Sequence, residues 1–181
     1  MKDLTDRLQA FGEAKAESER KAHNDKVQHI YDYADYIMKH REELNMLIAN
    51  ANAAVSAGIK LNTWSDNHNS YEEEDFLANG IRHRLGFIRS DYNGRVVGLG
   101  VIGGGWNGDV SVVYKNGELF YDTDKYYDHH KGFMVLHPLE SMHDTLLRHY
   151  EKAYKTFSND ILGFSKCFED YLEKVLDSAN H

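Results

Sequence analysis

The sequence predicts an α+β fold, in which a long N-terminal helix and a C-terminal αα-hairpin pack against a four-stranded antiparallel meander. Residues 132–136 are a possible fifth strand of this sheet. Apolar residues recur at three- and four-residue steps near both ends of the chain, as in amphipathic helices. Between these regions, three Asn-Gly dipeptides separate short β-branched runs, and Asn-Gly favours two-residue hairpins. With 181 residues and one proline, the chain suits a single ordered domain with a helical extension.

Residues 1–23 are predicted to form a solvated helical arm ahead of a single α+β domain over residues 24–181. Most of the arm is helix-prone but has almost nothing to bury. Its short apolar stripe consists of Leu4, Leu8 and Phe11. Because this stripe is out of register with the apolar positions that follow, we expect a break in the helix between Gly12 and Asn24.

A long helix is predicted over residues 24–57, which is about 50 Å at 1.5 Å per residue. Asn24 is a suitable N-cap, and Gly58 is a suitable residue just past the C-terminal end. A helix of this length in a chain of 181 residues must cross the body, bend or project from it. Its apolar stripe over residues 27–55 also allows a homodimer through a coiled coil.

Residues 71–78 are predicted to form a short helix, because Ser70 and Glu73 fit a capping box. The acidic run at the start of this segment suits the positive end of the helix dipole. The same carboxylates offer a surface to a basic partner. The candidate partner-binding residues in this run are Glu72, Glu73, Glu74 and Asp75.

The sheet is predicted over residues 84–122. Its three hairpin turns are the Asn-Gly pairs at residues 93–94, 107–108 and 116–117. If each loop has two residues, the register pairs Val113 with Phe120, Ile102 with Val113, and Ile88 with Leu99. Ile88 and Val97 then share an apolar face with Leu99, while Leu85, Phe87 and Val96 lie on the other. Both faces are largely apolar, so we expect helices or a partner to cover each of them.

The stretch Gly98-x-Gly100-x-x-Gly103 spells a dinucleotide-binding pattern, but a second strand follows it where that fold places a helix. We therefore assign no nucleotide and no other cofactor to the chain. Gly98 and Gly100 are expected to sit in the sheet, where the missing side chains allow another element to approach closely.

The C-terminal region is predicted to form an αα-hairpin of two helices, over residues 138–157 and 159–178. Pro138 suits the first position of the first helix, because a proline needs no helical hydrogen bond there. Ser158 or Asn159 is a suitable N-cap for the second helix.

Two further groups of residues are candidates for a site. Carboxylates and imidazoles over residues 122–130 could hold a divalent metal, although their spacing matches no familiar motif. The candidate ligands are Asp122, Asp124, Asp128, His129 and His130. Tyrosine and tryptophan are enriched in protein interfaces because they bury a large area at low entropy cost. The candidate aromatic partner contacts are Trp106, Tyr126 and Tyr127.

Charge and composition narrow the functional classes. The formal net charge of −8 is spread along the chain, which disfavours direct binding to nucleic acid and favours a basic protein partner. No apolar run is long enough to span a membrane, and Cys167 is the single cysteine, so we expect a cytoplasmic protein without membrane contact. No nucleophile elbow, phosphate-binding loop or Cys-x-x-Cys pair is present, which favours a non-enzymatic protein.

The favoured interpretation is an acidic protein-binding module that regulates or inhibits a basic, nucleic-acid-handling protein. Small acidic inhibitors encoded by phages and mobile elements, anti-CRISPR proteins among them, have this size and charge, although no residue motif connects the chain with them. The alternative is a small-ligand or metal-dependent enzyme or sensor with its site near residues 122–130.

Overall fold

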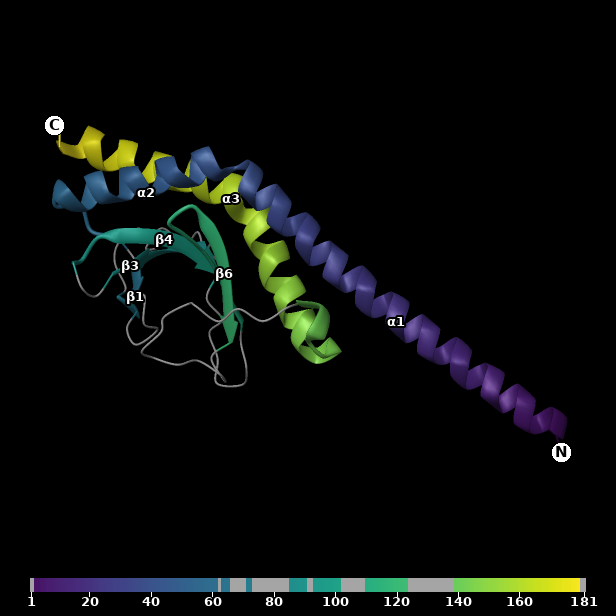
Figure 1. Cartoon of the computed structure of the whole chain (residues 1–181). Coiled ribbons are helices and arrows are strands. Elements are labelled where there is room, and N and C mark those ends of the chain that lie inside the picture. The colour runs from purple at the N-terminus through teal and green to yellow at the C-terminus, as the bar shows by residue number, and fades with distance from the viewer. Residues whose placement is uncertain are drawn as a thin grey trace.

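The described chain folds as three α-helices packed on one side of a six-stranded sheet (Figure 1). The computed structural model describes residues 2–61, 63–65, 71–72, 85–90, 93–101, 110–123 and 139–179. The helices are α1 (Lys2–Lys39), α2 (Arg41–Ser56) and α3 (Asp144–Ala179), with a short 3-10 helix, η3 (Leu139–Ser141), before α3. The strands are β1 (Thr63–Ser65), β2 (Tyr71–Glu72), β3 (Leu85–Arg89), β4 (Val96–Val101), β5 (Val110–Lys115) and β6 (Glu118–Thr123). The predicted α+β class and the meander β3-β4-β5-β6 are confirmed.

The helix predicted over residues 24–57 is two helices that meet at His40. The amide of His40 donates to the Ile37 carbonyl at 3.0 Å, which closes α1 with a tight turn, and α2 starts anew at the next residue. Ile37 and Leu44, on either side of the bend, are both fully buried in one core. The bend therefore keeps the buried residues of both helices in the same core. Most of the stripe over residues 27–55 packs inside the chain, so its buried members are not free to pair with a second copy.

The break predicted between Gly12 and Asn24 is wrong, because α1 continues through both positions. Every residue from 3 to 22 is exposed. Because none of these described residues is buried, the change in apolar register does not bend the helix. The N-terminal half of α1 instead leaves the body as a straight extension (Figure 1).

Gly58 ends α2 as the sequence predicts. Its φ of 84° lies in the left-handed region that favours glycine. Its amide donates to the Val55 carbonyl at 3.0 Å, and the amide of Ile59 donates to the Ala54 carbonyl at 2.9 Å. These two bonds form a Schellman motif, which satisfies carbonyls that the helix end would leave without partners.

Two short strands extend the meander beyond β3. β1 runs parallel to β3, and β2 pairs with β1 in the antiparallel sense. Residues 71–72 therefore form a strand, and the helix predicted over residues 71–78 is wrong at its start; residues 73–78 lie outside the described ones, as do residues 132–136. Pairing with an existing sheet edge outweighs the local helix signal, because it supplies partners for the backbone of both residues.

The register is as predicted for the last hairpin and differs in the others. Val113 pairs with Phe120, and the turn residues Asn116 and Gly117 have φ values of 55° and 81°, as a type I′ turn requires. On its other side, Val113 pairs with Gly100, two residues away from the predicted Ile102.

The turn near Asn93-Gly94 explains the error in β3. The amide of Ser90 donates to the Arg95 carbonyl at 2.8 Å, so this loop holds residues 91–94 rather than two residues. This loop alone would pair Phe87 with Gly98, and a bulge at Val97 moves the partner one residue along the strand, to Leu99. β3 and the first two residues of β4 therefore have the opposite faces to those predicted, whereas Leu99 and Val101 share a face with Val112 and Tyr114 as predicted. The residues that face the helices are Leu85, Phe87, Val96, Leu99 and Val101, whereas Ile88 and Val97 pack with Val113 and Phe120 on the opposite face.

Gly98 and Gly100 lie inside β4, which confirms their placement in the sheet and not at the start of a helix. A Cβ built on Gly98 would fall against the Tyr114 carbonyl. At Gly100 it would fall against the Val112 carbonyl and 2.8 Å from the Val113 Cα. The element that approaches closely is therefore the neighbouring strand β5, and any larger residue would push it away.

The predicted αα-hairpin is wrong, because α3 is one helix of 36 residues that contains both Ser158 and Asn159. Its buried residues continue across that point in steps of four, three and four. These residues are Phe157, Ile161, Phe164 and Phe168. One face therefore stays turned to the core along the whole helix, and no reversal of the chain is needed. No described helix is both long and apolar enough to cross a membrane.

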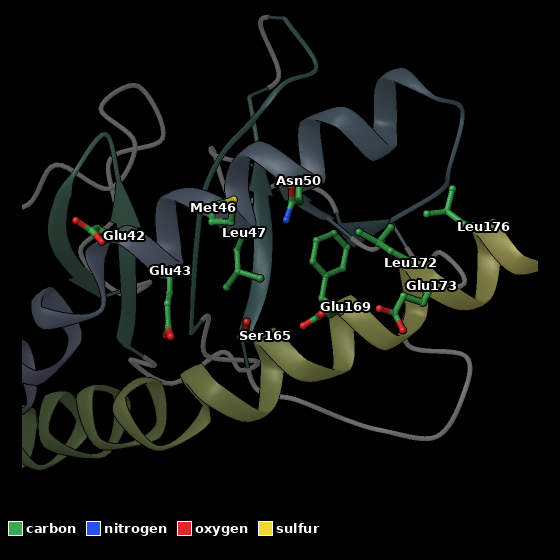
Figure 2. Close-up of a pocket in the computed structure, with 11 residues that line it drawn as sticks. Glu42, Glu43, Met46, Leu47, Asn50, Ser165, Glu169, Leu172, Glu173 and Leu176 are labelled. Atoms are coloured by element: carbon green, nitrogen blue, oxygen red, sulfur yellow. The ribbon is translucent and has the colours of Figure 1, made fainter.

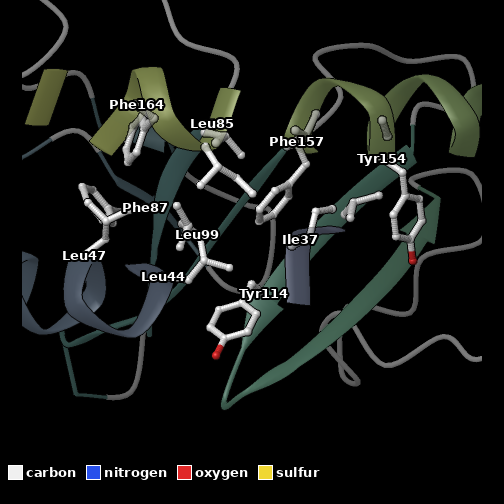
Figure 3. Packing of buried hydrophobic residues seen from close by; sticks show 14 of the residues in the cluster. Ile37, Leu44, Leu47, Leu85, Phe87, Leu99, Tyr114, Tyr154, Phe157 and Phe164 are labelled. Carbon is white, nitrogen blue, oxygen red and sulfur yellow. The ribbon is translucent and has the colours of Figure 1, made fainter. Parts of the chain in front are cut away.

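The core lies between the helices and the covered face of the sheet (Figure 3). Its centre is Phe87, whose ring meets the rings of Phe164 at 5.2 Å and Phe168 at 4.9 Å, both edge to face. This arrangement places the positive edge of one ring against the negative face of another. All three side chains are at most 1% exposed.

We expect Phe87→Ala to lower the free energy of unfolding by about 3–5 kcal/mol, because it removes a buried ring and leaves a cavity. Urea unfolding followed by circular dichroism measures this change. Phe11→Ala is the matched control, since Phe11 is 69% exposed, and its effect should stay within about 0.5 kcal/mol. Equal effects of the two substitutions would contradict the central place of Phe87.

Candidate protein-binding groove

Most candidate residues named from the sequence lie outside the described part of the chain. These are Glu73, Glu74, Asp75, Trp106, Asp124, Tyr126, Tyr127, Asp128, His129 and His130. Glu72 belongs to β2, and Asp122 pairs with Ser111 in the β5–β6 ladder, but only their backbone is described. Among the described residues, no group of three or more histidine, cysteine or acidic side chains could hold a metal. The partner contacts and metal ligands named from the sequence therefore stay predictions.

A groove of about 510 Å³ lies between α2 and the C-terminal part of α3, which run side by side in the same direction (Figure 2). Side chains of both helices line it at helical spacing. Those of α2 are Glu42, Glu43, Met46, Leu47 and Asn50, and those of α3 are Ser165, Phe168, Glu169, Leu172, Glu173 and Leu176.

Two hydrogen-bonded asparagines hold α2 against the sheet. The Asn52 side chain accepts from the amide of Val96 and donates to the Val96 carbonyl, both at 2.8 Å. About two turns earlier, Asn45 accepts from the Tyr114 hydroxyl at 2.7 Å. Since Asn45 and Asn52 are seven residues apart, they share one face of α2. The opposite wall is fixed where the Tyr171 hydroxyl donates to the Lys60 carbonyl at 2.9 Å. The groove is thus formed by elements that the fold holds in place.

The floor of the groove is apolar. Leu47 and Phe168 are 4% and 1% exposed, and Leu172 is half-buried beside them. Met46 and Leu176 extend the apolar surface outward and are 62% and 57% exposed. The chain leaves these two large side chains in contact with water, which a docked partner would remove.

The rim of the groove is acidic. The glutamates that line it are Glu42, Glu43, Glu169 and Glu173. All four are exposed, and none forms an ion pair with a cation of the described chain. No lysine, arginine or histidine is among the described lining residues. In Figure 2, Glu43 and Glu169 extend into the space between the two helices. The groove therefore offers an apolar strip bordered by negative charge.

A second, smaller cavity of about 370 Å³ lies between α1 and the β5–β6 turn. Its lining is mainly apolar, and Ile30, Met38, Leu119 and Tyr154 contribute to it. Only two acidic residues, Asp35 and Glu118, and no basic residue are among the described lining residues. The larger groove is the stronger candidate because it combines exposed apolar side chains with concentrated charge.

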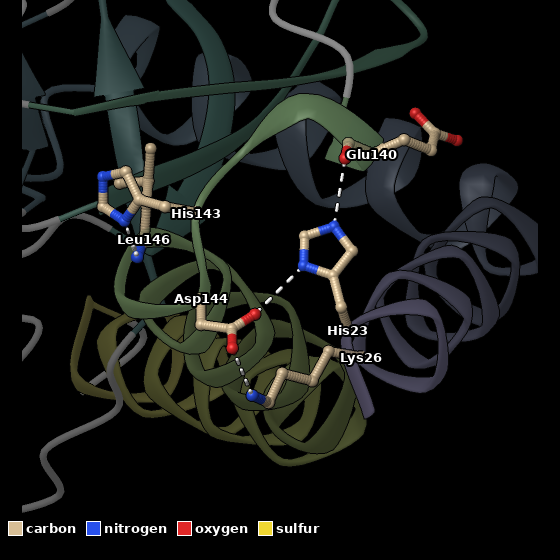
Figure 4. Close-up of polar contacts among 6 residues, drawn as sticks. All are labelled: His23, Lys26, Glu140, His143, Asp144 and Leu146. Carbon is tan, nitrogen blue, oxygen red and sulfur yellow. Dashed lines mark hydrogen bonds and ion pairs between the residues drawn. The ribbon is translucent and has the colours of Figure 1, made fainter. Parts of the chain in front are cut away.

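A polar cluster ties α1 to the start of α3 (Figure 4). His23 Nδ1 lies 3.0 Å from Asp144 Oδ1, and His23 Nε2 lies 3.0 Å from the Glu140 carbonyl oxygen. Lys26 Nζ is 3.9 Å from the other oxygen of Asp144, and the Tyr31 hydroxyl donates to the Glu140 carboxylate at 2.7 Å. Because neutral imidazole has only one N–H, His23 can donate to both oxygens only when it is protonated.

These bonds shift the pKa values of the partners in opposite directions. The bond to Asp144, followed by the bond to the Glu140 backbone, raises the pKa of His23. The bond from His23 lowers the pKa of Asp144, and the bond from Tyr31 lowers the pKa of Glu140. His143 points away from this cluster and caps α3 instead, since its Nδ1 accepts from the Leu146 amide at 3.3 Å.

Cys167, the single cysteine, is partly buried and packs against the core. Burial is the main cause that raises the pKa of its thiol, followed by the nearby carboxylate of Asp170. A thiol with a raised pKa is a poor nucleophile at neutral pH. Cys167 therefore contributes to packing, and we assign it no reactive role in the groove.

Sequence reasoning missed the groove, because its two walls are about 120 residues apart in the chain. It did predict an acidic surface, but placed it at residues 72–75. A local signal for the groove was present in Met46 and Leu176, because these large apolar residues lie outside the buried stripes of their helices. Comparisons of the chain with protein-family models, curated proteins and solved structures found no match. The function is therefore argued from the groove itself.

We expect the stabilising effect of His23 to fall as pH rises. Its pKa in the folded protein is raised above the ordinary value of about 6.5. The contribution is therefore complete below about pH 6.5 and is lost as pH passes the raised value. Urea unfolding of the native protein and of His23→Gln at about pH 5.5 and about pH 8.5 measures the difference.

The control for this experiment is His149→Gln, which removes an exposed histidine on the same helix as Asp144. Its effect at each pH is the baseline with which the effect of His23→Gln is compared. NMR titration of the His23 ring checks the direction of the pKa shift directly. A stability difference for His23→Gln that is the same at both pH values would show that the ring is not held in its protonated form.

Proposed function

We propose that the protein is a non-enzymatic, acidic protein-binding module whose groove between α2 and α3 holds a basic amphipathic helix of a partner protein. The observation that carries this proposal is the apolar floor bordered by four glutamates that form no ion pair within the described part of the chain. A helix is the form of ligand that fits, because the groove is an elongated space between two helices. Apolar anchors one turn apart would lie over Leu47 and Phe168, as in other complexes of a helix with a groove.

The charges of the rim would select and orient the partner. Lysine or arginine on both sides of the apolar stripe of a ligand helix would face Glu43 on one wall and Glu169 or Glu173 on the other. Exposed pairs of this kind add little affinity each, but they exclude acidic ligands and speed association. The net charge of −8 acts in the same direction over longer distances, so binding should weaken as salt is added.

In its more specific form, the proposal is that the partner is a basic, nucleic-acid-handling protein and that the chain regulates or inhibits it in the cytoplasm. Such proteins present clustered lysine and arginine to the phosphate backbone. An acidic surface that occupies these residues would compete with nucleic acid. The most specific form of this proposal is that the protein is an inhibitor encoded by a phage or mobile element, comparable in character to anti-CRISPR proteins.

The test uses a labelled synthetic peptide of about 15 residues, in which leucines form one face of a helix and lysines the other. Fluorescence anisotropy with the native protein should show saturable binding that weakens with salt. Glu169→Lys combined with Glu173→Lys should weaken binding by about tenfold or more, because two attractions become repulsions.

The matched control is Glu19→Lys combined with Glu118→Lys. It changes the net charge by the same amount at exposed positions that do not line the groove, so it should keep most of the affinity. A second peptide with glutamate in place of lysine should not bind. No binding by the native protein, or an equal loss in the control variant, would count against the groove.

A further inference from the structure

The N-terminal part of α1 carries an apolar stripe that the described chain leaves uncovered. Leu4, Leu8 and Phe11 are 54%, 62% and 69% exposed. They are three or four residues apart, so they form one continuous strip along the helix. In Figure 1 this part of α1 projects away from the body. Three large apolar side chains grouped on a projecting helix are typical of an interaction surface.

The same face of this helix is basic. Arg7 and Lys15 follow the stripe at three- and four-residue steps, so they border Leu4, Leu8 and Phe11. Asp6, Glu13 and Glu17 recur at steps of seven and four and lie on the opposite face. Glu17 is also paired with Arg20 there. Residues 4–15 have no net charge, but their apolar face carries only the basic side chains Arg7 and Lys15. This face therefore has the chemistry that the groove is proposed to bind.

The stripe and the groove also match in length. Residues 4–15 span about 18 Å of helix at 1.5 Å per residue. The wall of the groove on α3 runs from Ser165 to Leu176, which is the same number of residues. Leucine and phenylalanine would meet Leu47, Phe168 and Leu172, and Arg7 and Lys15 would approach the glutamates of the rim.

The stripe cannot reach the groove of its own chain. α1 is continuous over its 38 residues, about 57 Å, so its N-terminal half cannot fold back without breaking the helix. Figure 1 shows the N-terminus at one end of the molecule and the groove walls, α2 and the end of α3, at the other. Docking of this stripe in such a groove therefore requires a second copy of the chain.

We infer that residues 4–15 of one copy dock in the groove between α2 and α3 of a second copy. The contact joins two different surfaces, so it can close into a pair only if both copies exchange their helices, and otherwise continues from copy to copy. This inference rests on the proposed function because it uses the same groove. Because a second copy and a partner protein would use the same groove, self-association and partner binding exclude each other. Dilution of the protein would therefore free the groove for the partner.

Sedimentation velocity of the full chain from about 1 μM to about 1 mM tests the inference. The native protein should associate as its concentration rises. Phe11→Glu should abolish association by placing a carboxylate in the apolar strip. Glu169→Lys combined with Glu173→Lys should abolish it by reversing the charge of the rim. A mixture of these two variants should regain a single contact, because the first keeps an intact groove and the second an intact helix.

Gln9→Glu is the control, since Gln9 is also exposed but lies beside Glu13, to which its side chain donates, on the face away from the stripe. It should leave association unchanged. Circular dichroism verifies that all variants are folded, which we expect because every substituted residue is exposed. Reversing both sides in one chain, with Arg7→Glu and Lys15→Glu added to the groove variant, should restore association.

A native protein that stays monomeric over the whole range, or variants that still associate, would overturn the inference. The lysine peptide keeps this failure separate from that of the proposed function. If the peptide binds but the chain stays monomeric, only docking of residues 4–15 is excluded. If the chain associates as expected but the peptide does not bind, the inference stands and a foreign basic helix is excluded as the ligand.

Discussion

The packing of α3 on Phe87 is the contact on which the rest of the structure depends. Phe164 and Phe168 meet this ring edge to face, and through it the helix is held across β3. Sheet and helices bury little of their own apolar surface alone, so this layer supplies the shared core. The same contact fixes the position of α3 relative to α2. The groove between them is thus a direct consequence of how the core is packed.

Local chemistry predicted the parts of the fold that depend on a few neighbouring residues. Asn116-Gly117 gave the correct turn and register, because both positions need a positive φ. Gly58 gave the correct end of α2 for the same reason. Asn93-Gly94 led to a wrong register. A four-residue turn closed by Ser90 and Arg95 competes there with the predicted two-residue turn, and no local signal distinguishes the two.

The bend at His40, the two extra strands and the groove could not be predicted in the same way. Each depends on contacts between segments far apart in the chain, which periodicity does not report. The continuity of α3 could have been predicted, since apolar residues recur at regular helical steps from Phe157 to Phe168 without a break. For the site, the acidic character was predictable from composition, whereas its position at Glu43 and Glu169 required the arrangement of two helices.

Because α1 is uninterrupted, its exposed half is a rigid spacer of fixed length. Beyond His23, where the bonds to Asp144 and the Glu140 carbonyl hold the helix to the body, residues 2–22 extend about 32 Å at 1.5 Å per residue. A flexible tail would explore many directions and lose that freedom on binding, but a straight helix has already lost it during folding. Whatever contacts Leu4 or Phe11 is therefore held at a set distance and direction from the sheet.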